Sequence, residues 1–177
     1  FLYLFFGLLL YIFQRKILFN PSGKPFAPSY YGLTGTDINY ILTDDGISLL
    51  SWTFIGDNKK PLIIYFHGNS FDIGERAYRL KKYIDLNYSI LIVAWRGYSG
   101  NEGKPSEKNL YRDGEATINW VLKNTKFNLN NIIIYGESLG TGVAVALSTR
   151  YKFLLTVLEA PFTSISDIAK NKYKIYP

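Results

Sequence analysis

The stretch IIIYGESLGTG, residues 132–142, decides how the chain folds. An apolar, β-branched run ends at Gly136, Ser138 follows two residues later, and a run of small residues with helical character begins after it. This order predicts a strand, a sharp turn and a helix. The Gly136-x-Ser138-x-Gly140 spacing has a mechanical reason. A serine held on a strained turn presents its hydroxyl above the sheet, and side chains two positions to either side would collide there.

Length and composition bound what this chain can be. Its 177 residues are enough for one domain with a sizeable core. The net charge is +6, but the lysines are scattered along the chain, so we expect no nucleic-acid site. There is no cysteine, which excludes disulfides and thiolate metal sites. There is no methionine either, even at position 1, so we expect residues upstream of Phe1.

The N-terminal segment is unusually apolar. Residues 1–13 carry no charge and are followed by Gln14, Arg15 and Lys16. Three interpretations are open: the end of a transmembrane anchor, the core of a signal peptide, or a buried helix. Apolar residues around the whole helix circumference favour an anchor. We therefore expect a partial membrane anchor over 1–19 with its membrane side undetermined, a Pro-rich connector over 20–35, and a globular domain over 36–177.

The rest of the chain alternates between strand and helix signals. Strands are predicted over 36–43, 47–55, 61–66, 89–95, 131–135 and 154–158, and helices over 73–86, from 106 to about 124, and from Ser138 to about 151. The first two strands form a hairpin, with Asp45-Gly46 as its turn signal. Such alternation predicts an α/β fold with a mostly parallel sheet that is covered by helices on both faces. On the helix over 73–86 we expect one face, Ala77, Leu80 and Ile84, to point inward. The basic face should point outward, onto solvent or onto anionic lipid, and it consists of Arg76, Arg79, Lys81 and Lys82.

Reactive groups in such sheets lie at the carboxyl ends of the strands. Three segments lie at these strand ends: residues 67–69, 96–98 and 137–139. Acyl transfer needs a nucleophile, backbone N–H donors for the oxyanion, and a base. Ser138 is the candidate nucleophile, and the N–H groups of Leu139 and Asn69 are the candidate donors.

A base is harder to find. His67 is the only histidine of the chain. It precedes the serine, whereas the order typical of this arrangement is serine, acid, histidine. We expect His67 to shape the loop that follows the strand over 61–66, which we call the oxyanion loop because it contains Asn69. A role of His67 as base is the alternative. Asp113 is expected to satisfy a local hydrogen bond on its helix, with a role as catalytic acid as the alternative. Glu159 and Asp167 could act as acids only beside a histidine.

Four motifs, in this order, resemble the Bem46-type serine hydrolases of the α/β-hydrolase fold. They are FHGN at 66–69; RGYSG at 96–100 with GKPSE at 103–107 and LYRD at 110–113; GESLGTG at 136–142; and LEAPFTS at 158–164. The resemblance implies a membrane-anchored hydrolase of esters, thioesters or amides, acting on a small-molecule or lipid-like acyl substrate without metal or organic cofactor. It assigns Ser138 as nucleophile, Asn69 and Leu139 as oxyanion donors, and His67, Gly68, Gly136 and Gly140 as structural residues at the site.

In that family the acid and the histidine follow later strands. We therefore expect this sequence to be incomplete at both ends, to hold the N-terminal part of the fold without the last strands, and to be inactive by itself. The alternative is a non-catalytic, membrane-tethered binding or scaffold module derived from the hydrolase fold. A central strand left with an unpaired apolar edge would promote aggregation, which disfavours this alternative.

Overall fold

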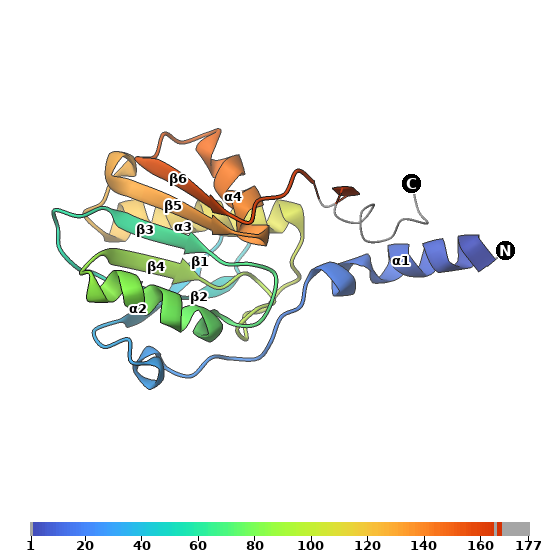
Figure 1. Cartoon of the computed structure of the whole chain (residues 1–177), viewed down its shortest axis with the longest axis horizontal. Coiled ribbons are helices and arrows are strands. Elements are labelled where there is room, and N and C mark those ends of the chain that lie inside the picture. The colour runs from blue at the N-terminus through green and yellow to red at the C-terminus, as the bar shows by residue number, and fades with distance from the viewer. Residues whose placement is uncertain (1, 165, 168–177) are drawn as a thin grey trace.

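The computed structural model describes residues 2–164 and 166–167. A single sheet forms its centre (Figure 1), built from β1 (Asp37–Leu42), β2 (Ser48–Phe54), β3 (Leu62–Phe66), β4 (Ser89–Val93), β5 (Ile132–Glu137) and β6 (Leu155–Glu159). The helices are α1 (Leu2–Leu18), α2 (Ala77–Asp85), α3 (Glu107–Asn124) and α4 (Leu139–Ser148). Three short 3-10 helices are η1 (Pro28–Tyr31), η2 (Ile73–Arg76) and η3 (Leu129–Asn131). Every predicted strand has a counterpart, so the α/β prediction is confirmed.

The strands lie in the order β1-β2-β4-β3-β5-β6. β1 and β2 form the predicted antiparallel hairpin, β2 pairs antiparallel with β4, and the remaining strands are parallel to one another. All five residues of β3 and all five of β4 are buried. These two strands read as continuous apolar runs because both of their faces are covered.

Two hydrophobic cores lie on opposite faces of the sheet. On one face, Leu62 and Ile64 of β3 pack with residues of α3 and α4, such as Val121 and Val143. On the other face, Ile63 and Tyr65 pack with residues of η2 and α2. Helices therefore cover both faces, as the alternation of strands and helices predicts.

One side chain of a predicted helix was placed wrongly. The helix expected over 73–86 begins as the 3-10 helix η2 and continues as α2. Ala77 and Leu80 are buried, and Arg76 lies on the same face because it precedes Leu80 by four residues. Arg76, expected to point outward, is buried at 7% exposure and forms an ion pair with Glu137.

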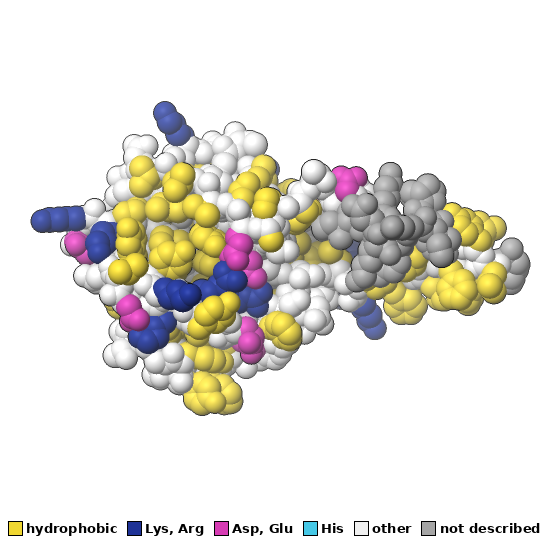
Figure 2. Space-filling model, in the orientation of Figure 1, with side chains coloured by type: hydrophobic (Ala, Val, Ile, Leu, Met, Phe, Trp, Pro, Cys, Tyr) yellow, Lys and Arg dark blue, Asp and Glu magenta, His cyan; other side chains and the backbone are white. Residues whose placement is uncertain are grey.

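α1 projects away from the sheet (Figure 1), and Figure 2 shows apolar side chains along it. None of its residues is buried, and several large apolar side chains, such as Leu4 and Tyr11, are mostly exposed. No helix within residues 2–164 and 166–167 is both long enough and apolar enough to cross a membrane. The chain then re-enters the domain at Phe19, which is buried in the core.

A buried ion pair between Arg96 and Asp113 joins the loop after β4 to α3. The Nε of Arg96 donates to Asp113 at 2.8 Å, and the Arg96 backbone N–H donates to the same carboxylate at 3.0 Å. Nη1 of Arg96 also donates to Asp45, in the turn of the hairpin, at 2.7 Å. Asp113 therefore bonds a distant element, and the expected local hydrogen bond was wrong. The bonds from Arg96 hold the pKa of the Asp45 carboxyl well below its usual range.

This pair makes Asp113→Asn the most informative stability variant of the fold. Removing the charge leaves the buried Arg96 without its main counterion, and breaking a buried pair costs about 3 to 5 kcal/mol. We expect urea denaturation to show a loss of that size. Asp85→Asn serves as the control, because it removes one half of the exposed Lys81–Asp85 pair and should change little. Equal effects of the two variants would contradict the assignment.

Candidate active site

Ser138 lies on the sharp turn between β5 and α4. Its backbone has φ 47° and ψ −111°, a region that residues other than glycine rarely adopt. The neighbouring glycines permit the turn. A methyl group at position 136 would lie 2.7 Å from the carbonyl oxygen of Gly140, and one at position 140 would fall onto the carbonyl of Phe66. Both glycines are therefore required by the close approach of backbone to backbone.

The loop after β3 lies beside this turn. In the parallel register of β3 and β5, Phe66 is opposite Gly136, so the segments that follow both strands leave the same edge of the sheet. The N–H groups of Asn69 and Leu139 donate hydrogen bonds to no residue within the described part of the chain. Unused donors on two adjacent loops form the kind of environment that stabilises a developing oxyanion.

His67 is fully buried under this loop. Its Nδ1 donates to the carbonyl oxygen of Gly68 at 2.7 Å, and its Nε2 accepts the backbone N–H of Trp95 at 3.3 Å. Burial, reinforced by the charge of Arg76, lowers the pKa of His67 to about 3. The chain itself therefore occupies both ring nitrogens, and the ring is neutral at physiological pH.

The segment after α1 holds the loop from its other side. Asn20 donates its N–H to the Asn69 carbonyl at 3.0 Å and accepts the N–H of Phe71 at 3.0 Å. The Asn69 side chain donates to the carbonyl of Leu18 at 2.8 Å. Residues 20–35 were expected to be only a connector, and no local signal in the sequence marks this long-range pairing.

Glu137 and Arg76 form a second contact between turn and loop. Glu137 accepts Nε and Nη2 of Arg76 at 3.1 and 3.0 Å, together with the hydroxyl of Tyr65 at 2.8 Å. Nη1 of Arg76 donates to the carbonyl of Ser70 at 2.5 Å. A methyl group at Gly68 would lie 3.0 Å from Glu137 Oε1, so this glycine leaves room for the ion pair. Sequence reasoning missed both charged residues.

The other carboxylates considered as acids bond elsewhere. Glu159 accepts hydrogen bonds from Nη1 of Arg79 at 2.6 and 2.8 Å and from the hydroxyl of Tyr135 at 2.6 Å. The bond from Tyr135, followed by those from Arg79, lowers the pKa of Glu159. Arg79, expected to face outward, is therefore also paired. Asp113 is bound by Arg96, and Asp167 accepts the hydroxyl of Thr163 at 2.7 Å. No histidine accompanies any of these carboxylates, since His67 is the only one in the chain.

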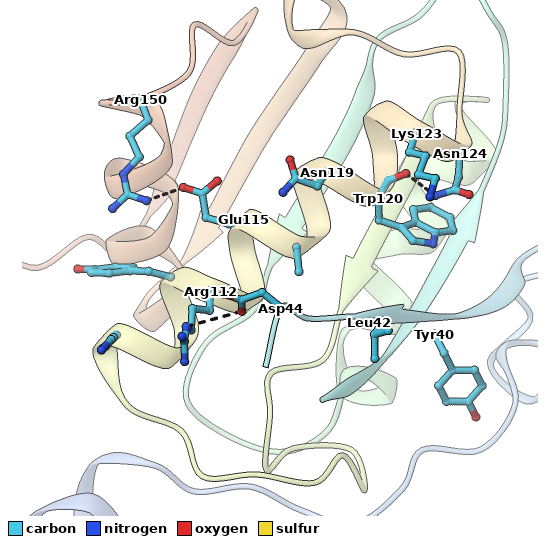
Figure 3. A pocket seen from close by; sticks show the side chains of 13 residues that line it. Tyr40, Leu42, Asp44, Arg112, Glu115, Asn119, Trp120, Lys123, Asn124 and Arg150 are labelled. Carbon is cyan, nitrogen blue, oxygen red and sulfur yellow. Dashed lines mark hydrogen bonds and ion pairs between the residues drawn. The ribbon is translucent and has the colours of Figure 1, made fainter. Parts of the chain in front are cut away.

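Two hollows, each of about 750 Å³, flank α3. One is mainly apolar and adjoins the turn, with Phe19, Leu139, Val143 and Phe162 in its lining. The other lies between β1 and α3 (Figure 3), where the ion pairs Arg112–Asp44 and Arg150–Glu115 cross its wall. It contains none of the candidate residues, so the apolar hollow is the better candidate for a substrate. Among the described residues, no group of three or more His, Cys, Asp or Glu could hold a metal ion.

No protein-family model matches the sequence. Individual relatives do match. Human α/β hydrolase domain-containing protein 17B is 38% identical over 118 residues, which are 63% of this chain and 39% of the relative. Protein bem46 of Schizosaccharomyces pombe is 28% identical over 171 residues, 90% of this chain and 57% of the relative. The chain spans between 39% and 62% of the length of the curated relatives that it matches.

A solved structure shows the same fold. The Pyrococcus furiosus esterase Pf2001 matches with a TM-score of 0.71 at 19% sequence identity, over 89% of this chain and 64% of that protein. Similarity in sequence to α/β hydrolase domain proteins thus agrees with similarity in architecture to an esterase. These similarities fit a Bem46-type α/β-hydrolase.

Proposed function

We propose that the complete protein is a serine acyl hydrolase of esters or thioesters. The observation that carries this proposal is the strained backbone of Ser138, at φ 47° between two sterically required glycines. Strain of this kind persists where the surrounding structure enforces it, and it gathers at functional sites. Similarity in sequence to α/β hydrolase domain proteins and the fold shared with an esterase support the same chemistry.

In the proposed reaction, Ser138 Oγ attacks the carbonyl carbon of the substrate and transfers its proton to a base. The carbonyl oxygen becomes an oxyanion that accepts the N–H groups of Asn69 and Leu139. The tetrahedral intermediate then expels the alcohol or thiol, which takes a proton from the protonated base, and leaves an acyl group on Ser138. Water releases the acid in the reverse order of steps.

The base in this proposal is not His67, whose ring nitrogens are both engaged by the chain. The resemblance to Bem46-type hydrolases implies that an acid and a histidine follow later strands. We therefore assign the base to a part of the protein outside residues 1–177.

The substrate in this proposal is a small molecule or lipid with an apolar acyl group. The apolar hollow beside Leu139 supports this choice, because its lining suits a hydrocarbon chain. The exposed apolar side chains of α1 support a position at a membrane, where such substrates are concentrated.

A second candidate function is a non-catalytic, membrane-tethered binding module. One observation favours it: Ser138 Oγ forms no hydrogen bond within the described residues, and the one histidine of the chain is buried. Such a module would use the apolar hollow to hold an acyl chain without cleaving it.

Ser138→Ala separates these two functions. In the full-length protein, we expect the variant to lose covalent labelling by a fluorophosphonate and to hydrolyse a p-nitrophenyl ester roughly 10⁴- to 10⁶-fold more slowly. Ser22→Ala, on the exposed connector, is the matched control and should retain both signals. Undiminished labelling of Ser138→Ala would exclude this serine as nucleophile, and an unlabelled, inactive wild-type protein would favour the binding module.

His67 should not titrate in the physiological range. We expect its imidazole NMR signals, assigned by their loss in His67→Gln, to stay constant between pH 8 and pH 5, because the folded pKa is about 3. The folded pKa lies below the unfolded value of about 6.5, so this group's contribution to stability is complete above pH 6.5. It declines by up to about 1.4 kcal/mol per pH unit below that. A midpoint near pH 6.5 would restore His67 as a candidate base.

Membrane association should depend on α1. We expect the full-length protein to sediment with phosphatidylcholine vesicles and to resist high salt. Replacing Leu4, Phe5 and Leu8 together by Asp should move it to the supernatant, because charged side chains are costly in the acyl region. Leu86→Asp, at an exposed site beside α2, is the control and should leave sedimentation unchanged. Equal sedimentation of both variants would contradict the proposal.

A further inference from the structure

Two arginines, in η2 and α2, bind carboxylates that lie next to Ser138. Arg76 ends η2 and binds Glu137, the residue directly before the serine. Arg79, one turn later in α2, binds Glu159 at the end of β6. The carbonyl oxygen of Glu159 accepts the N–H of Ser138 itself, at 2.8 Å. The residue before the serine and the residue that accepts the serine's own N–H are thus both bound by arginines of the same helical segment.

Arg76 also connects the turn to the oxyanion loop. Its Nε and Nη2 donate to Glu137, and its Nη1 donates to the carbonyl of Ser70, the residue after Asn69. A single rigid guanidinium therefore spans the two segments whose N–H groups must converge on one oxygen atom. Arginine suits this task because its donors lie in a fixed plane, whereas a lysine presents one flexible ammonium.

Tyrosines join the two ion pairs to each other. The hydroxyl of Tyr65 donates to Glu137, and that of Tyr135 donates to Glu159. The two rings are stacked, with their centroids 4.8 Å apart and their planes 10° from parallel. The stacked rings therefore link the two ion pairs, so that a displacement of Glu137 would also disturb the ring that binds Glu159.

A purely structural role is the simpler explanation of a buried ion pair, and the chain contains one with which to compare it. Arg96 and Asp113 are buried more deeply than Arg76 and Glu137, but they tie α3 and the hairpin turn to the loop after β4. Buried pairs add little net stability compared with apolar residues of the same size. What distinguishes Arg76 is that all of its bonds end on the oxyanion loop or beside Ser138.

We propose that Arg76 is a positioning residue. Through Glu137 and Ser70 it holds the oxyanion loop against the turn between β5 and α4, which carries Ser138. The N–H groups of Asn69 and Leu139 then converge. This inference rests on the proposed acyl hydrolase function and names a residue that this function requires. Arg76 touches no reacting atom, so its loss should lower the rate of the chemical step and leave substrate binding nearly unchanged.

The test uses Arg76→Lys in the full-length protein, with a p-nitrophenyl ester as substrate. Lysine keeps the charge but cannot span Glu137 and Ser70 together. Loss of one oxyanion donor costs about 10²- to 10³-fold, so a displaced donor should lower kcat by about 10- to 100-fold, with KM within about threefold. The matched control is Arg96→Lys, the same substitution in the comparison pair, and its kcat should stay within about threefold of wild type.

A second readout separates positioning from loss of stability. A trifluoromethyl ketone forms a tetrahedral adduct whose oxygen occupies the oxyanion site, whereas an unreactive ether analogue of the substrate does not. In Arg76→Lys the Ki of the ketone should rise by the same factor by which kcat falls, and the Ki of the ether should be unchanged. Should Arg76→Lys fail to fold, Glu137→Asp, which shortens the other half of the pair, is expected to show the same signature.

The outcomes are distinct. An active wild-type protein whose Arg76→Lys variant keeps its kcat and its ketone Ki overturns the positioning role and leaves the proposed hydrolase function standing. Equal losses of kcat in Arg76→Lys and Arg96→Lys also overturn it, because they would reflect stability alone. A wild-type protein without hydrolysis or labelling removes the proposed function, and this inference with it.

Discussion

The first turn of α4 packs directly against the backbone at the end of β3, and residue 140 can carry no side chain because the carbonyl of Phe66 occupies that space. This contact sets the distance between α4 and the sheet. It places the N-terminal end of α4, with its free N–H groups, next to the loop that begins at His67. The backbone of Ser138 must then turn through a positive φ to connect β5 with a helix that starts so close to the neighbouring strand.

Charge inside the domain is concentrated where the sheet ends. The middle of β3 and β4 is apolar, whereas the segments after the strands contain arginine–carboxylate pairs and a neutral, fully bonded histidine. Loops lack the ladder of hydrogen bonds that holds a strand, so side chains must satisfy their backbone groups instead. Arg76 does so for Ser70, and Asn69 does so for Leu18. Side-chain hydrogen bonds therefore hold the loop after β3 in place beside Ser138.

Features encoded by neighbouring residues could be predicted from the sequence, and those made by distant residues could not. The Asp45-Gly46 turn and the strand–turn–helix around Ser138 each depend on local preferences, and the structure contains both. Arg76 was misplaced because its charge favours an exposed position, whereas its partner Glu137 lies 61 residues away in the chain. The partner of Asp113 and the pairing of Asn20 with the loop after β3 bring together residues far apart in the chain, for which a single sequence carries no signal.

The strand order has a consequence for synthesis of the chain. The hairpin of β1 and β2 joins the sheet only through β4, and β3 pairs only with β4 and β5, both of which leave the ribosome after it. Until β4 emerges, the nascent chain holds an isolated hairpin and an unpaired apolar strand, and exposed segments of this kind are prone to aggregate. A translational pause before Ser89 would prolong that state. A pause after β4 has cleared the exit tunnel would instead give the hairpin, β4 and β3 time to assemble as one sheet.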